Sequence, residues 1–245
     1  MLVTTDYRIG IEDVGENNEV TNKCFLEALT NVTNYHGFLI GQGTGHLDTM
    51  PLGWVVTNWK LEVYERPTIC EVMTARTWVE NYSHALANRG NDVIAPDGHV
   101  IARAASTWVA IDLEAGKPYH LDERVMGPYE AEPDTHECLT WRYGKVRDAN
   151  FTVEGSSKVT VGKAMIDIND HVRNPMYLDL VMEALPEPLD RAHFDYLEVT
   201  YRAEVKAGDI VTVEYGTMAD GKFGVRIVDD EGRVHVTMLM DKRRN

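Results

Sequence analysis

An internal repeat constrains this chain more than any other feature of its sequence. Residues 7–10 correspond to residues 159–162 at a shift of 152 (159 minus 7), and the same shift places 22–27 on 174–179. Both of the latter segments continue with apolar residues at steps of three and four, which is typical of a helix packed on a core. We therefore expect two copies of one unit rather than one large domain.

Each predicted helix is followed by segments rich in Val, Ile, Thr, Tyr and Trp, which favour strands. Short turns such as Asp220-Gly221 separate these segments, and such turns join antiparallel neighbours. Each copy is predicted to contain a strand, a helix and three or four antiparallel strands, an α+β unit whose helix packs on the sheet. The predicted later strands are 54–65, 69–80, 82–88 and 99–111 in the first copy, and 194–205, 210–218, 223–229 and 233–241 in the second.

The connection between the copies is irregular, with Pro118, Pro128, Pro133 and many acidic residues. So long a run is unusual in a compact domain, and part of it is expected to pack on the surface. The predicted organisation is an N-terminal domain at 1–120, a linker at 121–150 and a C-terminal domain at 151–245.

The composition argues against several classes of partner. The formal charge of −15 repels phosphate backbones and anionic lipids, so neither nucleic acid nor membrane is expected as a partner. Cys24, Cys70 and Cys138 are odd in number and far apart, and form neither a disulfide framework nor a zinc ligand set. Residues 1–10 have no feature of a signal peptide, so we expect a cytoplasmic protein.

The densest polar segment precedes the second helix and contains Asp167, Asn169 and His171. Because two positions separate each from the next, an extended segment would point all three to one side. They would then meet a helix N-terminus, whose backbone N–H groups stabilise a developing oxyanion, and histidine exchanges protons near neutral pH. Asp and Asn before a helix are also ordinary caps, so the segment alone leaves both interpretations open.

Comparison of the two copies favours chemistry in the second. A capping group should occur equally in both copies, yet only one of the three polar residues does. The corresponding residues are Gly15 for Asp167, Asn17 for Asn169 and Glu19 for His171.

Two segments resemble the acyl-acyl carrier protein thioesterase family, which includes plant enzymes. Residues 159–179 resemble the segment around its catalytic Asn and His, and residues 196–204 resemble its later strand, in which a catalytic Glu follows a Tyr-Arg pair. The resemblance covers nearly the whole chain. It implies a tandem double hot-dog fold of the α+β class, with two antiparallel sheets each wrapped around a helix. Many relatives have Cys after this Glu, where this chain has Val205, which argues against a Cys–His mechanism. We expect a bacterial-type member without the transit peptide of the plant enzymes.

The resemblance implies hydrolysis of a fatty acyl-carrier thioester by direct attack of water. Glu204 would be the general base in an enclosed site, and Asn169 would position the water or the carbonyl. His171 would hydrogen-bond the thioester and protonate the leaving sulfur, with Asp167 orienting Asn169 and His171. Backbone N–H groups near Val172 and Arg173 would form the oxyanion site. Which of Glu204 and His171 is the base stays open.

The acyl chain needs an apolar pocket, expected between the first helix and its sheet. Its candidate wall residues also have the spacing of ordinary core residues. Basic residues around the motif could contact an acidic carrier protein, or could form a solvated face. The candidate wall residues are Phe25, Leu29, Trp54 and Trp78, and the basic residues are Lys145, Arg147, Lys158, Lys163 and Arg173, with Arg173 also a candidate substrate contact.

Three alternative functions stay open. An acyl-coenzyme A thioesterase would present the same thioester, and a hot-dog dehydratase or hydratase also uses Asp or Asn with His. An acyl-binding module without turnover is the third. No cofactor and no metal are expected, and the oligomeric state is predicted as monomer or homodimer.

Overall fold

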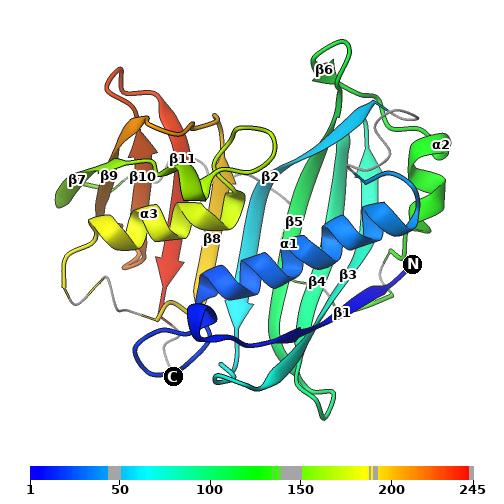
Figure 1. Cartoon of the computed structure of the whole chain (residues 1–245), viewed down its shortest axis with the longest axis horizontal. Helices are drawn as coiled ribbons and strands as arrows, with labels where there is room; N and C mark the ends of the chain where they lie inside the picture. The colour runs from blue at the N-terminus through cyan, green and yellow to red at the C-terminus, as the bar shows by residue number, and fades with distance from the viewer. Residues whose placement is uncertain are drawn as a thin grey trace.

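The computed structural model describes residues 1–43, 51–133, 135–137, 139, 151–187, 189 and 193–242. Its strands form one antiparallel sheet of 11 strands, and helices α1 and α3 lie against the same face of that sheet (Figure 1). The strand order is β1-β3-β4-β5-β2-β8-β11-β10-β9-β7, with β6 paired to β5. The predicted α+β class is therefore confirmed.

The N-terminal copy is the larger of the two. Helix α1 begins after Thr21, whose hydroxyl accepts a hydrogen bond from the Cys24 backbone N–H, an ordinary N-cap. Its apolar side packs on β3, β4 and β1. The elements are β1 (Val3–Arg8), η1 (Ile11–Asp13), α1 (Asn22–Leu39), β2 (Leu52–Val63), β3 (Val72–Ser83), β4 (Leu86–Ile94), β5 (Val100–Asp112), β6 (Lys117–Pro118), α2 (Glu123–Met126) and η3 (Gly127–Tyr129).

The C-terminal copy repeats the order from β1 to β5, with a shorter helix and shorter strands after it. Pro175 lies in the 3-10 turn that leads into α3, where its missing N–H costs no helical hydrogen bond. The elements are β7 (Gly155–Thr160), η4 (Lys163–Met165), η5 (Asn174–Met176), α3 (Tyr177–Ala184), β8 (Tyr196–Tyr201), β9 (Ile210–Thr217), β10 (Phe223–Val228) and β11 (Val234–Asp241).

The two predicted sheets are the halves of one continuous sheet, joined where β2 pairs with β8. Leu61 lies opposite Leu197 across this seam, and both side chains are fully buried. One apolar core runs beneath both helices, and an ion pair of 2.9 Å between Lys23 and Asp179 links α1 to α3 at its surface. The two copies thus share a core.

One predicted strand was misplaced. The segment 82–88 was expected to be a strand, but the chain turns there and β4 runs from Leu86 to Ile94. His84 has a φ of 54°, the left-handed conformation of a tight turn, and no Gly, Asn or Asp marks that position.

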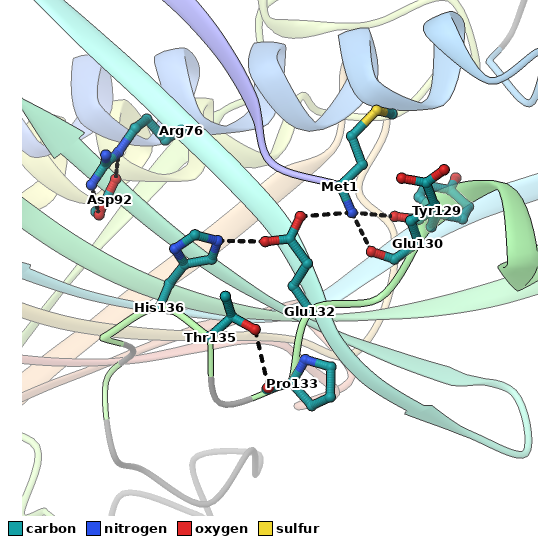
Figure 2. Close-up of polar contacts among 9 residues, drawn as sticks. All are labelled: Met1, Arg76, Asp92, Tyr129, Glu130, Glu132, Pro133, Thr135 and His136. Carbon is teal, nitrogen blue, oxygen red and sulfur yellow. Dashed lines mark hydrogen bonds and ion pairs between the residues drawn. The ribbon is translucent and has the colours of Figure 1, made fainter.

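The first part of the connection packs against the N-terminal copy. Val125, Met126 and Tyr129 are buried in a second apolar cluster with strand residues of that copy. Figure 2 shows how the next residues are held: the Met1 ammonium contacts the Tyr129 carbonyl at 2.8 Å and Glu132 at 3.0 Å, and Glu132 contacts His136. This segment covers the end of the sheet beyond the C-terminus of α1.

Candidate active site

The segment that carries the predicted motif is a closed loop. Ile166 and Val172 form an isolated bridge at its neck, and the Asp167 N–H donates to the His171 carbonyl at 2.9 Å. The Asp167 carboxylate accepts hydrogen bonds from the backbone N–H of Asn169 at 2.8 Å and of His171 at 3.2 Å. The expected extended segment is therefore wrong, and Asp167 instead holds the loop together.

The loop brings His171 to Glu204. The His171 Nε2 atom lies 2.8 Å from Glu204 Oε2, so the predicted histidine and carboxylate form one pair. The Glu204 side chain is 66% exposed and that of His171 is 32% exposed. The expected enclosure of Glu204 is wrong, and bulk water reaches this carboxylate directly.

Two contacts hold the backbone that carries the Glu204 side chain, one at the Glu204 carbonyl and one at the Val205 carbonyl. The Val172 N–H donates to the Val205 carbonyl at 3.0 Å, which ties the loop to the segment that follows β8. The His235 ring on β11 bridges the Glu204 carbonyl at 2.9 Å and the Asp229 carboxylate at 3.1 Å. Both partners of His235 are acceptors, so the ring satisfies both contacts when it carries two protons.

His235 was not predicted from the sequence, which gives no signal for it. Its role depends on the antiparallel register of β11 and β8, which places Val236 opposite Tyr201. That register becomes visible only once the sheet is assembled.

The predicted backbone oxyanion site is not formed. The Val172 N–H is used by the Val205 carbonyl, and the Arg173 N–H donates to the Met165 carbonyl at 2.9 Å. Helix α3 itself begins only at Tyr177, beyond a 3-10 turn. A side-chain donor on the same loop is the Asn169 amide, which donates one hydrogen to Asp167 Oδ2 at 3.4 Å and has a second one to give.

A cavity of about 910 Å³ lies between this loop and the N-terminal copy. Asp167, Asn169 and Arg173 line one side, and Glu27 and Asn31 of α1 line the other. Burial raises the pKa of the Glu27 carboxyl, an effect that the nearby Lys23 and Arg173 oppose. Arg173 also donates to the Ala164 carbonyl at 2.9 Å. Neither Glu27 nor Asn31 was predicted as a site residue, although both lie in the polar stripe of the predicted first helix.

The predicted acyl-pocket residues separate into three environments. Trp54 lines the large cavity. Phe25 and Leu29 have no exposed surface and pack in the shared core. Trp78 lies on the opposite face of the sheet from α1, because the preceding Thr77 faces Thr33 of α1, and its ring packs on His136 at 4.7 Å.

The predicted basic residues are only partly described. Lys158 pairs with Asp230 at 2.7 Å, while Lys163 and Arg173 are exposed near the loop. Lys145 and Arg147 lie outside the described residues. Within the described part of the chain, no three His, Cys, Asp or Glu side chains are grouped to hold a metal, and no helix is both long and apolar enough to cross a membrane.

The N-terminal copy contains the same loop with different side chains. Val14 and Val20 form the equivalent bridge, and the Gly15 N–H donates to the Glu19 carbonyl at 2.9 Å. The Val20 N–H donates to the Pro67 carbonyl as that of Val172 does to Val205, so Arg66 occupies the position of Glu204. Glu19 replaces His171 and pairs with His193 at 3.2 Å.

The fold defined by these observations is a double hot-dog, with two helix-bearing antiparallel sheets fused in one chain. Three solved structures share it. An acyl-ACP thioesterase from Bacteroides thetaiotaomicron matches with a TM-score of 0.86 and 23% identity over 98% of this chain and 97% of its own. An oleoyl thioesterase (putative) from Lactobacillus plantarum has a TM-score of 0.82 and 20% identity, and the 12:0-ACP thioesterase from Umbellularia californica 0.78 and 18%, each covering 100% of this chain and 98% of its own.

The chain belongs to the acyl-ACP thioesterase family. The family's N-terminal domain matches residues 1–129 and its C-terminal domain residues 150–241. Oleoyl-acyl carrier protein thioesterase 2 of Arabidopsis thaliana is 26% identical over 81% of this chain, and a palmitoyl-acyl carrier protein thioesterase of Gossypium hirsutum is 30% identical over 68%. The chain spans 58% and 42% of the length of these two plant proteins.

Proposed function

We propose that this chain hydrolyses the thioester of a fatty acyl group on acyl carrier protein, releasing the free fatty acid and the carrier thiol. The observation that carries the proposal is the 2.8 Å contact between His171, on the loop whose Asp167 and Asn169 line the large cavity, and Glu204, on the segment after β8. A paired carboxylate and imidazole can move a proton from an attacking water to a leaving group. Membership of the family supports the choice of substrate.

The pair suggests the following order of events. Water attacks the thioester carbonyl carbon while Glu204 takes its proton, and the Asn169 amide stabilises the negative charge on the carbonyl oxygen. His171 gives a ring proton to the departing thiolate, and the proton that Glu204 took from the attacking water returns to His171 through bulk water, which reaches both side chains. The carbon–sulfur bond breaks as the fatty acid forms. Val205, which follows Glu204, leaves no thiol nucleophile at that position.

Asp167 and His235 act as positioning residues in this scheme. Asp167 fixes the loop through the backbone of Asn169 and His171, and His235 holds the Glu204 backbone. Neither needs to touch the substrate.

The experiment that tests the function measures free thiol release from acyl-carrier-protein thioesters by the wild type, Glu204→Gln and Glu231→Gln. Glu231 is an exposed carboxylate in the turn between β10 and β11, which makes it a matched control. We expect Glu204→Gln to lose about 10²- to 10⁴-fold in kcat, the usual size of a general-base contribution, and Glu231→Gln to behave as wild type. Equal turnover by all three proteins would remove Glu204 from the mechanism.

Acyl-coenzyme A substrates in the same assay separate the two carriers. Release from coenzyme A alone would keep the site but change the substrate class. No release from any thioester by folded protein would favour an acyl-binding module. A cytoplasmic location and a state of monomer or homodimer stay predictions.

A further inference from the structure

A buried arginine lies on the helix-facing side of the N-terminal sheet. The Arg89 side chain on β4 is 4% exposed, and its Nε donates to Thr77 Oγ1 at 3.1 Å. Its Nη2 donates to His36 Nδ1 at 2.7 Å, and its guanidinium lies over the Tyr129 ring at 5.6 Å from the centroid.

All three of these partners are neutral. Burial, followed by the charge of Arg89, lowers the pKa of His36 to about 3, and burial raises the pKa of Tyr129 to about 12. Among the described residues no carboxylate pairs with Arg89, whereas the half-exposed Arg76 makes a two-pronged pair with Asp92 on the other face of the sheet (Figure 2). A buried cation without a counter-ion is strongly unfavourable unless polar groups or a ligand offset it.

Arg89 borders a cavity of about 90 Å³, which is large enough for a few heavy atoms. Thr33, Gln42 and Tyr129 also line it. The Gln42 Nε2 donates to the Val125 carbonyl at 2.7 Å, which fixes the amide orientation and leaves Oε1 buried without a hydrogen-bond partner in the described structure. The cavity therefore offers a charged donor and an unused acceptor together.

This small cavity adjoins the large cavity at the motif loop. Asn34, Gly43, Trp54 and Trp108 line both of them. An acyl chain that runs from Asn169 of the motif loop along the large cavity would pass these residues before its far end met Arg89.

We propose that the small cavity binds a hydroxyl group on the distal half of the acyl chain, so that hydroxylated fatty acyl thioesters are the preferred substrates. This rests on the proposed thioesterase function. A hydroxyl oxygen accepts from the Arg89 guanidinium while its hydrogen is donated to Gln42 Oε1, so one group meets the charged donor and gives the unused Gln42 acceptor a partner. A carboxylate would match Arg89 but would face the Gln42 oxygen, and a methyl end would satisfy neither.

The test compares thiol release from two acyl thioesters of equal chain length, one plain and one hydroxylated on its distal half. A hydrogen bond to a charged donor predicts a preference on the order of 10- to 100-fold in kcat/KM for the hydroxylated chain. Arg89→Met should abolish that preference, whereas Arg76→Met, which removes a guanidinium from the opposite face of the sheet, should retain it. Equal or better use of the plain chain by the wild type, or a preference that survives Arg89→Met, would overturn the proposal.

A second variant, a second substrate and a binding measurement test the proposal further. If Arg89→Met does not fold, Gln42→Met removes the acceptor together with the hydrogen bond to the Val125 carbonyl and should reduce the preference, and an unchanged preference would overturn the proposal. Stronger use of a chain ending in a carboxylate than of the hydroxylated chain would also overturn it. If no thioester is hydrolysed, the proposed function fails separately. Calorimetric titration with free hydroxylated and plain fatty acids then decides, since tighter binding of the hydroxylated acid supports the cavity's role and equal binding contradicts it.

Discussion

Asn18 and Asp170 hold the same left-handed backbone conformation, with φ values of 62° and 61°, at the same position of two equivalent loops. The N–H of each donates to the carbonyl three residues earlier, that of Gly15 or of Asp167, and an isolated bridge closes each loop. The backbone of the site is thus a property of the repeated unit. The side chains on it differ: the C-terminal loop carries the histidine itself, paired with Glu204, whereas the N-terminal loop carries Glu19, paired with His193.

The Asp167 carboxylate should matter through geometry. We expect Asp167→Ala to lower kcat by about 10- to 100-fold with little change in KM, because the hydrogen bonds that position Asn169 and His171 are lost and small misplacements of reacting groups are costly. Steady-state kinetics with an acyl-carrier thioester measures this. Asp170→Gly is the control, since glycine adopts the observed φ without strain and should keep near-wild-type turnover. An equal loss in both variants would show that the loop merely tolerates no change.

His235 should also affect kcat, because it contacts the backbone carbonyl of Glu204. Replacing it with Asn removes the bridge between the Glu204 carbonyl and the Asp229 carboxylate, so we expect kcat to fall by about tenfold while KM changes little. His99→Asn, at an exposed histidine in the N-terminal copy, is the matched control. A fall in thermal stability with unchanged kcat in the folded protein would assign His235 a structural role only.

The repeat accounts for how much of the fold was predictable. The shift that aligns the sequences also carries β1 (Val3–Arg8) onto β7 (Gly155–Thr160) and η1 onto η4 without any offset. Asp167, Asn169, His171 and Glu204 were predicted as one site, and the structure brings them together.

Other features of the site depend on contacts between segments that are distant in the sequence, which a pattern along the chain does not contain. The helix and the strand after it are longer in the N-terminal copy, 18 and 12 residues against 8 and 6, so one shift cannot reveal that Arg66 corresponds to Glu204. The face on which Trp78 lies depends on strand parity, where one residue reverses the direction of a side chain. The backbone N–H groups of Val172 and Arg173 seemed free only because their carbonyl partners lie elsewhere in the sequence.

Arg66 should contribute mainly to stability. Its guanidinium donates to the Val20 carbonyl at 2.8 Å in one copy and to the Phe194 carbonyl at 3.0 Å before β8, so it ties the copies together. We expect Arg66→Lys to lower the free energy of unfolding by about 2 kcal/mol, because one ammonium cannot reproduce the forked contacts. Urea denaturation measures this, with Arg8→Lys as a control, because Arg8 is exposed and makes a single bond to the Cys70 carbonyl, so its loss should be less than about 1 kcal/mol. Equal losses would contradict a joining role for Arg66.

His36 should make the protein sensitive to acid. The folded state holds this ring neutral, because burial and Arg89 lower its pKa to about 3, while the unfolded chain binds a proton near pH 6.5. The unfolded state therefore binds more protons between these values, and stability falls as the pH drops through that window, by up to about 1.4 kcal/mol per pH unit.

His36→Asn tests this contribution. The Asn oxygen can still accept from Arg89 but does not titrate, so the unfolding free energy should depend less on pH between about 6 and 4, whatever its value at pH 7. Urea denaturation at several pH values gives this slope. A slope equal to that of the wild type would exclude His36 as its source.

The most direct test of the account is a double-mutant cycle on kcat for thiol release from an acyl-carrier thioester, using His171→Ala, Glu204→Ala and the double variant. If the two side chains act as one proton-transfer unit, each single variant loses about 10²- to 10⁴-fold and the double variant is no slower than the slower single one. Losses that multiply in the double variant, or a single variant with wild-type turnover, would contradict a shared role for His171 and Glu204.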